Sequence, residues 1–240
     1  MKPNFQFDHN RFYATSPQPC PYIKGKTEQR IFTELRGNRI QTLYDDLSRS
    51  GFRRSQDVCY IPACSDCKDC IAVRIITDEF TPSASQKRCI KKNEDLISVE
   101  LSPSSSYEQY ALFKTYQEVR HNDSEMLQMS FKNFKNFVEK TPVETKLVEF
   151  RLFDNRLMAV CLFDKISDGF SAVYSFFDPF VKGRGLGNYM VLWLVLEAKK
   201  LGLPFVYLGY WIKRSQKMSY KDKFQPLEYF TPEGWKRVLV

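Results

Sequence analysis

The feature that most constrains this chain is a basic, glycine-dense turn between a strand-like run and an apolar helical run. The turn reads Lys-Gly-Arg-Gly-Leu-Gly over residues 182–187, and Pro179 ends the strand-like run 170–178 just before it. A helix is expected from about Leu186 to Leu201, apolar on nearly every side and therefore enclosed. Glycines let backbone N–H groups approach an anion, and a helix start adds unpaired N–H groups and the positive end of its dipole. The turn is therefore either a binding site for a phosphate or a carbonyl oxygen, or only a connection between a strand and a helix.

Composition predicts a globular protein with a polyanionic partner. The chain has 240 residues, 43% hydrophobic and 15% aromatic, which allows one large or two small domains. It shows neither an apolar run of about eighteen residues nor the apolar region of a signal peptide, so we expect a soluble, cytoplasmic protein without a membrane partner. The formal net charge of +8 is concentrated in clusters. These indicate nucleic acid ahead of a membrane surface, or else a solvated basic face.

Four of the seven cysteines lie close together in the sequence. Cys59, Cys64, Cys67 and Cys70 follow the spacing C-x4-C-x2-C-x2-C. Such a run could hold zinc or an iron–sulfur cluster, or it could consist of reduced structural thiols near a surface turn. Without a secretory signal, thiols or metal ligands are favoured over disulfides. No cofactor is required by anything else in the sequence.

The order of expected elements divides the chain in two. Residues 1–25 are irregular, a helix is expected at 39–50, and strands at 58–61 and 71–76. The polar stretch 81–95 is expected to be a basic helix or linker, so we place the boundary between domains 1–95 and 96–240. The second domain is expected to contain strands at 97–101, 146–153, 157–164, 170–178 and 205–211, and helices at 107–120, 130–140 and 186–201.

This order predicts a mixed α/β (α+β) fold and resembles a known acyltransferase fold. The sequence β-α-α-β-β-β-turn-α-β, with the glycine turn before the third long helix, is similar to that of the GCN5-related N-acetyltransferases (GNAT). Their phosphate-binding turn reads Gln/Arg-x-x-Gly-x-Gly/Ala, and here the turn begins with Lys182. We therefore expect a GNAT-like C-terminal domain and a smaller N-terminal, cysteine-containing domain.

Several motifs together resemble a narrower family, the aminoacyl-tRNA–protein transferases of the N-degron pathway. The match runs over nearly the whole chain, and the compact length resembles the bacterial aspartate/glutamate leucyltransferase branch. The motifs are Cys20-Pro-Tyr22, Gly51-Phe-Arg-Arg-Ser55, Cys64-x-x-Cys67-x-x-Cys70-Ile-x-Val-Arg74, Phe80-x-Pro-Ser-x-Ser-Gln-Lys87, Tyr116-Gln-x-x-x-His-x-Asp123, Val173-Tyr-Ser-Phe-Phe-Asp-Pro179, Tyr207-Leu-Gly-Tyr-Trp211, Lys217-Met-x-Tyr-Lys221 and Phe224-x-Pro-Leu-Glu228.

The resemblance implies transfer of leucine from leucyl-tRNA to the α-amine of proteins that begin with Asp or Glu, which creates an N-degron for proteolysis. An α-amine has a pKa of roughly 7.7–8.0 and the donor is an activated ester, so positioning can supply most of the rate. The developing oxyanion needs a donor, for which we name the backbone of Gly185–Gly187 and the hydroxyls of Tyr174 and Tyr210. Asp178 or His121 could accept a proton, or could be a turn cap and a structural histidine.

Binding roles are expected for three further sets of residues. The aminoacylated 3′ end of tRNA would lie at Lys182, Arg184, Gly185, Leu186 and Gly187. Recognition of an acidic N-terminal residue needs a cation, preferably arginine. The candidates for this site lie in or beside the first motifs: Lys24, Arg53, Arg54 and Arg74 as cations, together with Tyr22. The tRNA backbone would contact Lys87, Arg88, Lys91, Lys92, Lys213, Arg214, Lys217 and Lys221.

Three other functions stay open from the sequence. An arginyl-tRNA–protein transferase would keep the family and change the transferred residue. A coenzyme-A-dependent N-acetyltransferase would use the same fold and glycine turn. A non-catalytic RNA- or metal-binding module would use the cysteine cluster.

Overall fold

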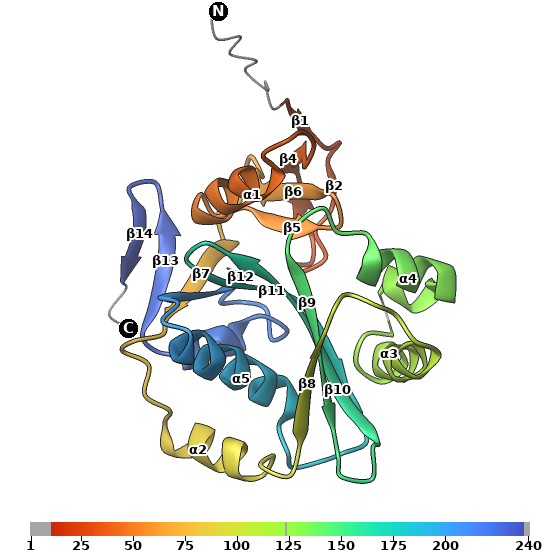
Figure 1. Cartoon of the computed structure of the whole chain (residues 1–240). Coiled ribbons are helices and arrows are strands. Elements are labelled where there is room, and N and C mark those ends of the chain that lie inside the picture. The colour runs from red at the N-terminus through yellow and green to blue at the C-terminus, as the bar shows by residue number, and fades with distance from the viewer. Residues whose placement is uncertain (1–10, 123, 238–240) are drawn as a thin grey trace, which may run out of the picture.

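The computed structural model describes residues 11–122 and 124–237 and shows two sheet units that pack on each other (Figure 1). The smaller unit is a four-stranded sheet in the order β1-β4-β6-β5, with a two-stranded sheet of β2 and β3 beside it. Helix α1 follows β4 on the same unit. The elements are β1 (Phe12–Ala14), β2 (Gln18–Pro19), β3 (Thr27–Glu28), β4 (Arg30–Glu34), α1 (Ile40–Arg49), β5 (Arg53–Ser55) and β6 (Val58–Pro62).

The larger unit is built on an eight-stranded sheet in the order β14-β13-β7-β12-β11-β10-β9-β8. Its strands are β7 (Ile71–Ile76), β8 (Ile97–Leu101), β9 (Thr145–Arg151), β10 (Leu157–Ile166), β11 (Gly169–Phe177), β12 (Phe205–Trp211), β13 (Leu227–Thr231) and β14 (Gly234–Arg237). Its helices are α2 (Ala84–Lys91), α3 (Tyr107–Arg120), α4 (Phe131–Glu139) and α5 (Leu186–Lys200), with short 3-10 turns at Glu125–Gln128 and Ser219–Lys223.

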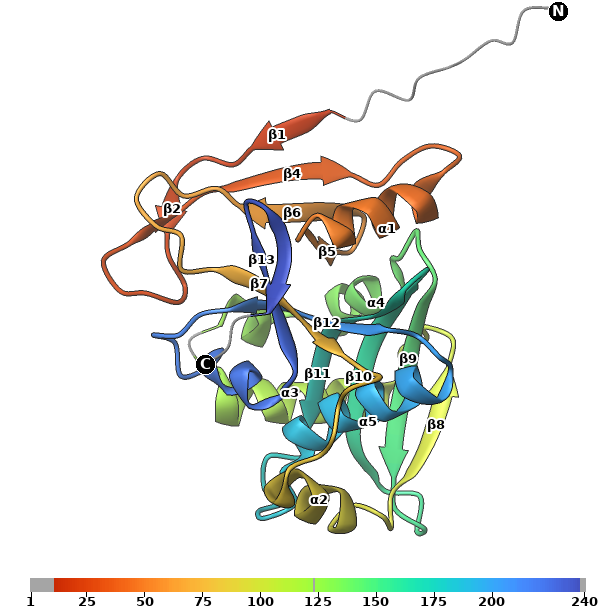
Figure 2. The same ribbon diagram turned by 90° about the vertical axis from the view of Figure 1, so that its left-hand side faces the viewer.

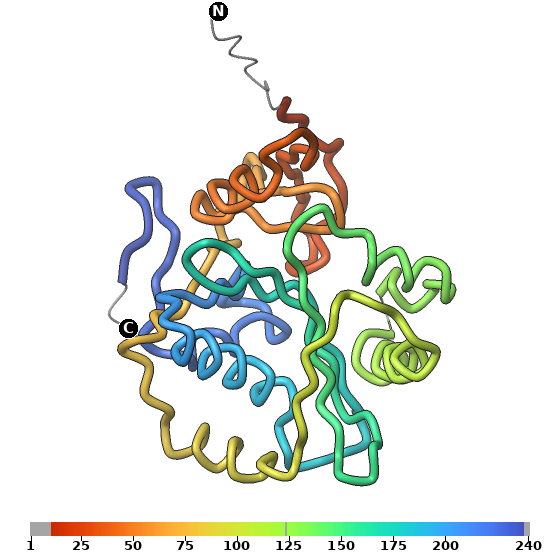
Figure 3. Tube along the Cα trace, in the orientation of Figure 1, coloured from red at the N-terminus to blue at the C-terminus, as the bar shows by residue number. Residues whose placement is uncertain are grey.

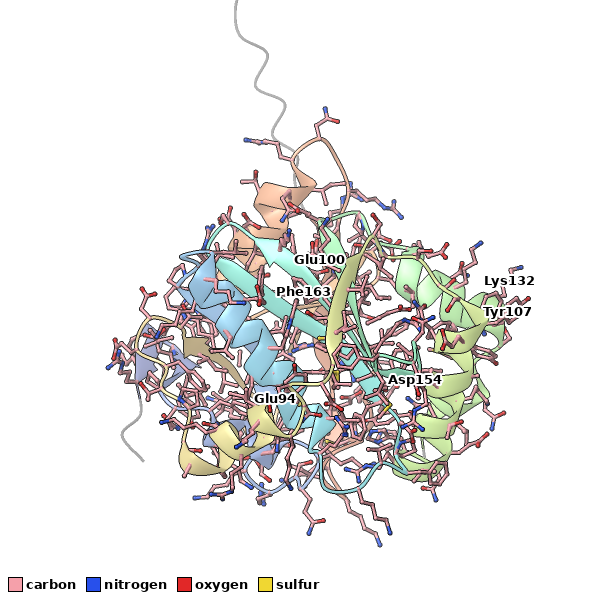
Figure 4. All side chains as sticks on the ribbon, turned by 60° about the horizontal axis from the view of Figure 1, so that its bottom comes forward. Glu94, Glu100, Tyr107, Lys132, Asp154 and Phe163 are labelled. Carbon is pink, nitrogen blue, oxygen red and sulfur yellow. The ribbon has the colours of Figure 1, made fainter. Side chains whose placement is uncertain are left out.

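The two faces of the large sheet carry separate cores. On β10, Cys161 and Phe163 belong to the core under α5, whereas Val160 and Leu162 belong to the core under α3 and α4. This alternation follows from the two-residue period of a strand. Figure 4 places Phe163 on the sheet near α5 and Tyr107 on the opposite side. The sheet is therefore a middle layer between helices.

The mixed α/β fold class is confirmed, and the order from β8 to β12 is the one expected for a GNAT-like unit. Helix α5 is enclosed as predicted, because residues around most of its circumference are buried between the sheet and α2. Serines open α2 and α3 with reciprocal capping boxes, Ser83 with Gln86 and Ser106 with Gln109.

The sheets do not divide at residue 95, where we placed the domain boundary. Strand β7 lies inside the large sheet, hydrogen-bonded to β12 on one side and β13 on the other, and the last strand of the small sheet ends at Pro62. The two units are thus interleaved in sequence, as the tube in Figure 3 shows. The apolar run 71–76 has two buried faces, which is the property of an interior strand and not of a domain edge.

The C-terminal hairpin of β13 and β14 joins the two units (Figure 2). Trp235 donates from Nε1 to the carbonyl of Arg49 at 2.7 Å, and the ring of Phe230 lies against Gly51. These two strands are not predicted by the sequence, and neither are β1 to β5. The expectation that residues 1–25 are irregular is wrong for β1 and β2. Among the described residues no helix is long and apolar enough to cross a membrane.

Candidate active site

The strands β11 and β12 pair in parallel for only three residues and then diverge. The last pair in register is Ser171 with Tyr207, after which β11 pairs only with β10, and β12 only with β7. A register shift in β12 between Tyr207 and Gly209 accompanies the separation. Diverging parallel strands leave unpaired backbone groups at their carboxyl ends, which is where open α/β sheets place ligands. We call this gap the β11–β12 wedge.

Arg53 of the small unit reaches into the β11–β12 wedge. Its Nη2 donates to the carbonyl oxygens of Ala172 at 2.7 Å and Val173 at 3.2 Å, the first residues of β11 without β12 beside them. Gly209 makes room for the guanidinium, since a Cβ there would lie 1.6 Å from Nη1. No carboxylate among the described residues forms an ion pair with Arg53. The wedge thus holds a cation without a counter-charge.

A cavity of about 830 Å³ lies beside the end of β12, between the small sheet and the C-terminal hairpin. Its wall includes Tyr22, Tyr60 and Tyr210, and Tyr60 and Tyr210 are in contact with ring centroids 6.1 Å apart. Cations outnumber carboxylates in the wall: Lys26, Arg30, Lys68 and Lys213 against Glu28 and Asp222. Burial raises the pKa of Tyr22 to about 12, so this hydroxyl stays protonated. The cavity can bind a ligand of peptide size that carries negative charge.

The glycine turn caps α5 as the sequence predicts. Gly183 and Gly185 have φ of 83° and 68°, which glycine adopts without strain. In the described part of the chain, the N–H groups of Leu186, Gly187 and Asn188 have no backbone partner. The side chain of Leu186 is buried, so it can offer a ligand only its N–H group.

Helix α2 lies against this turn and brings basic residues to it. Asn93 donates to the carbonyl of Arg184 at 2.9 Å, and Lys92 donates to that of Gly183 at 2.9 Å. Arg184 itself forms a bidentate pair with Asp95, both distances being 2.6 Å, so its charge is largely compensated. Four of the predicted tRNA contacts are exposed and lie on α2 or directly after it, and Lys92 contacts the turn: Lys87, Arg88, Lys91 and Lys92.

Tyr174 and His121 belong to one polar cluster between α3 and β11. Gln117 donates to the hydroxyl of Tyr174 at 2.7 Å, and His121 Nε2 lies 3.2 Å from the hydroxyl of Tyr116. Gln117 is fully buried and its Oε1 has no hydrogen-bond partner. Gln117 belongs to the motif that begins at Tyr116, but nothing in the sequence predicts a role for its side chain. A buried acceptor without a donor is a place where a substrate or water can bind.

Two other candidates have structural partners. Asp178 Oδ1 accepts from the N–H of Phe180 at 3.0 Å, the turn-cap arrangement that was the alternative for this residue. Tyr210 donates to the carbonyls of Tyr60 at 2.9 Å and Gly51 at 3.2 Å, so its hydroxyl joins the two units and does not face an oxyanion. Its assignment as an oxyanion donor needs correction.

The predicted tRNA contacts after β12 are split by burial. Lys213, Arg214 and Lys217 are exposed, and Arg214 pairs with Asp69. Lys221 is buried, with 5% of its surface accessible, and donates to the carbonyl of Tyr210. Its prediction as a tRNA-backbone contact is wrong for this structure, because a phosphate cannot reach a buried amine.

Burial lowers the pKa of Lys221 well below its ordinary value of 10.5, and the nearby charge of Arg53 lowers it further. The folded protein then binds fewer protons at this site than the unfolded chain, so stability rises with pH between the folded pKa and 10.5. In that range the free energy of unfolding of the wild type, relative to Lys221→Met, should rise by about 1.4 kcal/mol per pH unit. Urea unfolding at several pH values measures this slope. Lys87→Met is the exposed control, and the wild-type unfolding free energy relative to this variant should not change with pH. The same pH slope relative to both variants would contradict a buried, neutral Lys221.

The five candidates for recognising an acidic residue lie in different environments. Arg54 forms a buried pair with Asp164, and Arg74 pairs with Glu228 at 2.7 Å under the ring of Phe205, so both are corrected to structural residues. Lys24 is exposed, Tyr22 lines the cavity, and Arg53 occupies the wedge. Arginines in a motif do not reveal which of them already has an internal carboxylate.

The predicted cysteine set also needs correction. Cys59 is fully buried in β6, and burial raises its pKa to about 12. Cys20, Cys64 and Cys67 lie close enough to Cys70 to raise its pKa. The charged neighbours of Cys59 are instead Arg54 and Asp164, so Cys59 is not part of this group. Burial raises the pKa of Cys70 to about 12, with a smaller contribution from the three neighbouring thiols. Among the residues that the structure describes, no three His, Cys, Asp or Glu side chains are grouped as a metal site.

The order of elements, the β11–β12 wedge and the capped turn define a GNAT-like α/β unit. A solved structure, L-PGS from Bacillus licheniformis, has a similar fold with a TM-score of 0.53 and 13% identity over 67% of this chain and 57% of that one. The family models for arginine-tRNA-protein transferases match at both ends, the N-terminal model over residues 18–88 and the C-terminal model over residues 108–231. The chain belongs to the arginine-tRNA-protein transferase family, which confirms the resemblance found in the sequence.

Two curated relatives are similar over nearly their whole length and carry the name aspartate/glutamate leucyltransferase. The one from Paramagnetospirillum magneticum is 50% identical over 226 residues, which cover 94% of this chain and 93% of that protein. The one from Sphingopyxis alaskensis is 47% identical over 243 residues, which cover 99% and 94%.

Proposed function

We propose that this protein transfers leucine from leucyl-tRNA to the α-amine of proteins that begin with Asp or Glu. The observation that carries the proposal is the similarity, at 47–50% identity over nearly the full length, to relatives named for that transfer. The product begins with leucine and would act as an N-degron. Because the donor is a charged tRNA, we place the reaction in the cytoplasm.

The donor end is assigned to the glycine turn and the β11–β12 wedge. The exposed lysines and arginine of α2, together with Lys182, surround the turn with positive charge that suits the tRNA backbone. The unpaired N–H groups at Leu186 and Gly187 suit a phosphate or carbonyl oxygen at the start of α5. Lys213, Arg214 and Lys217 form a second basic group that we assign to the same tRNA.

In the reaction, the neutral α-amine attacks the ester carbonyl carbon of leucyl-tRNA. A C–N bond forms, the C–O bond to the 3′ ribose breaks, and the amine proton ends on that ribose oxygen. We assign Tyr174 to stabilising the developing oxyanion or to transferring the proton. Its hydroxyl accepts a hydrogen bond from Gln117, and its own hydrogen has no acceptor among the described residues. We assign His121, whose Nε2 lies 3.2 Å from the Tyr116 hydroxyl, as the proton acceptor of this cluster.

The acceptor is assigned to the cavity beside β12. Its aromatic wall can hold the first residues of a polypeptide, and its excess of cations suits an acidic side chain. Tyr22 would contact the acceptor directly. Arg53 would add positive charge behind the Tyr60–Tyr210 pair, and Lys24 would do so at the exposed rim.

Transfer of labelled leucine or arginine from charged tRNA to peptides beginning Asp, Glu, Arg or Ala tests the function. Leucine on the Asp and Glu peptides alone is the expected result, with binding of tRNA that weakens steeply as salt rises. Arginine transfer would keep the family and change the donor. Absence of transfer with either, combined with thermal stabilisation by acetyl-CoA, would instead favour an N-acetyltransferase.

A further inference from the structure

Arg30 lies in the cavity wall with a carboxylate of the same chain already bound to it. Its Nη2 donates to both oxygens of Glu28, at 2.8 and 2.9 Å. Its guanidinium carbon lies 5.0 Å from the centre of the Tyr60 ring, within the range of a cation–π contact. Nε and Nη1 have no hydrogen-bond partner among the described residues. Arg30 therefore has donors left for a second carboxylate.

The Arg30–Glu28 pair differs in exposure from the other arginine pairs near the site. The Arg54 and Asp164 side chains are 2% and 0% exposed, whereas those of Arg30 and Glu28 are 34% and 18% exposed. An ion pair in contact with solvent stabilises a fold by only about 0–1 kcal/mol. The Arg30–Glu28 pair is only partly exposed, so Glu28 can leave Arg30 at a lower cost than Asp164 can leave Arg54 when another carboxylate enters.

The surroundings of Arg30 favour an entering anion. Lys26, Lys68 and Lys213 line the same cavity, and the only carboxylates in its described wall are Glu28 and Asp222. The charge of Arg53 also acts on Tyr22, so it adds to the positive potential at the cavity floor. A neutral amide of the same shape gains nothing from this potential, which gives a physical basis for choosing Asp and Glu over Asn and Gln.

We propose that Arg30 reads the acidic side chain of the acceptor and that Glu28 occupies Arg30 until the acceptor displaces it. This inference rests on the proposed function and names its specificity residue. The acceptor carboxylate takes the place of Glu28 at Nη2 and can also accept from Nε or Nη1, while the Tyr60 ring stays beside the guanidinium. Glu28 acts as an internal competitor, so that only a charged side chain of suitable length gains from the exchange.

Equilibrium binding of fluorescent peptides beginning Asp or Asn, measured without tRNA, tests the exchange. Arg30→Gln should weaken binding of the Asp peptide by about 10–100-fold, the loss expected for a charge-assisted hydrogen bond, and leave the Asn peptide unchanged. Glu28→Gln should tighten binding of the Asp peptide several-fold, because the competitor loses its charge. In the transfer reaction the same changes should appear in KM for the peptide and not in KM for leucyl-tRNA.

The chain offers a matched control at the end of β4. Arg36 and Glu34 repeat the spacing and the contact, with Arg36 Nη2 at 3.0 Å from Glu34 Oε1, but neither lines the cavity. Arg36→Gln and Glu34→Gln should leave peptide binding unchanged. Equal loss for Asp and Asn peptides in Arg30→Gln, no loss at all, or a wild type that does not prefer the Asp peptide would overturn the inference. Failure of the proposed function is seen separately, as absence of leucine transfer by a wild type that still binds the Asp peptide.

Discussion

Replacing Gly209 with alanine is expected to destabilise the protein by about 3 kcal/mol or more and to abolish most of the transfer activity. Gly209 has φ of 73°, and an added Cβ would lie 1.6 Å from Arg53 Nη1 and 2.3 Å from its Cζ. The guanidinium cannot move aside without losing its bonds to Ala172 and Val173. The change therefore forces Arg53 out of the β11–β12 wedge.

Unfolding in urea, with leucine transfer measured on the same samples, provides the test. Gly202→Ala is the control, since Gly202 has a similar φ of 67° but no heavy atom near the position of an added Cβ, and should cost about 1 kcal/mol. Adding Arg53→Ala to Gly209→Ala removes the clash, so the two losses should not add. Strictly additive losses would contradict the steric argument.

Removal of the Asp164 carboxylate should cost about 3–5 kcal/mol of unfolding free energy, because it leaves the Arg54 guanidinium buried without a counter-charge. Asp164, on β10, accepts from Arg54 at 2.6 and 2.7 Å, from Thr145 at 2.6 Å and from Tyr44 at 2.7 Å, and all four side chains are buried. This network joins α1 and β5 of the small unit to the large sheet. Asp164→Ala is therefore also expected to loosen the contact between the two units.

The control for Asp164→Ala is an ion pair that is exposed to solvent. Asp57 pairs with Lys140 at 2.7 Å, with 43% and 58% of their side chains exposed, so Asp57→Ala should change stability by no more than about 1 kcal/mol. Substituting both partners, as Arg54→Met with Asp164→Leu, should recover most of the loss, since no unpaired charge remains. A loss for Asp164→Ala as small as that for Asp57→Ala would show that solvent reaches the network.

The elements that the sequence predicts well are those whose signal is local. Helix α3 and strands β8 and β12 have the predicted bounds, and α5 begins at Leu186 as expected. Each has a capping serine, a glycine with positive φ or a run of β-branched and aromatic residues within a few positions of its ends. The motifs that carried the family resemblance are local in the same sense, and the comparisons confirm them.

The site residues were harder because their roles depend on partners far away in the chain. Arg53 and Arg54 are neighbours in one motif, yet Arg53 lies in the wedge and Arg54 is neutralised by a residue 110 positions later. Lys221 is of the residue type that contacts phosphates, yet it is buried. Arg30 lies outside every motif, yet it lines the cavity. No spacing pattern predicts which charge finds a counter-charge.

By itself the sequence determined the fold class, the family, the capped glycine turn and the overall positive charge. All four depend on residues within one element or on sums over the chain. Tertiary structure decided the place of β7 in the large sheet, the divergence of β11 and β12, and which arginine remains uncompensated in the wedge. These follow from long-range packing and from the cost of burying an unpaired charge, so they exist only when the two units are brought together.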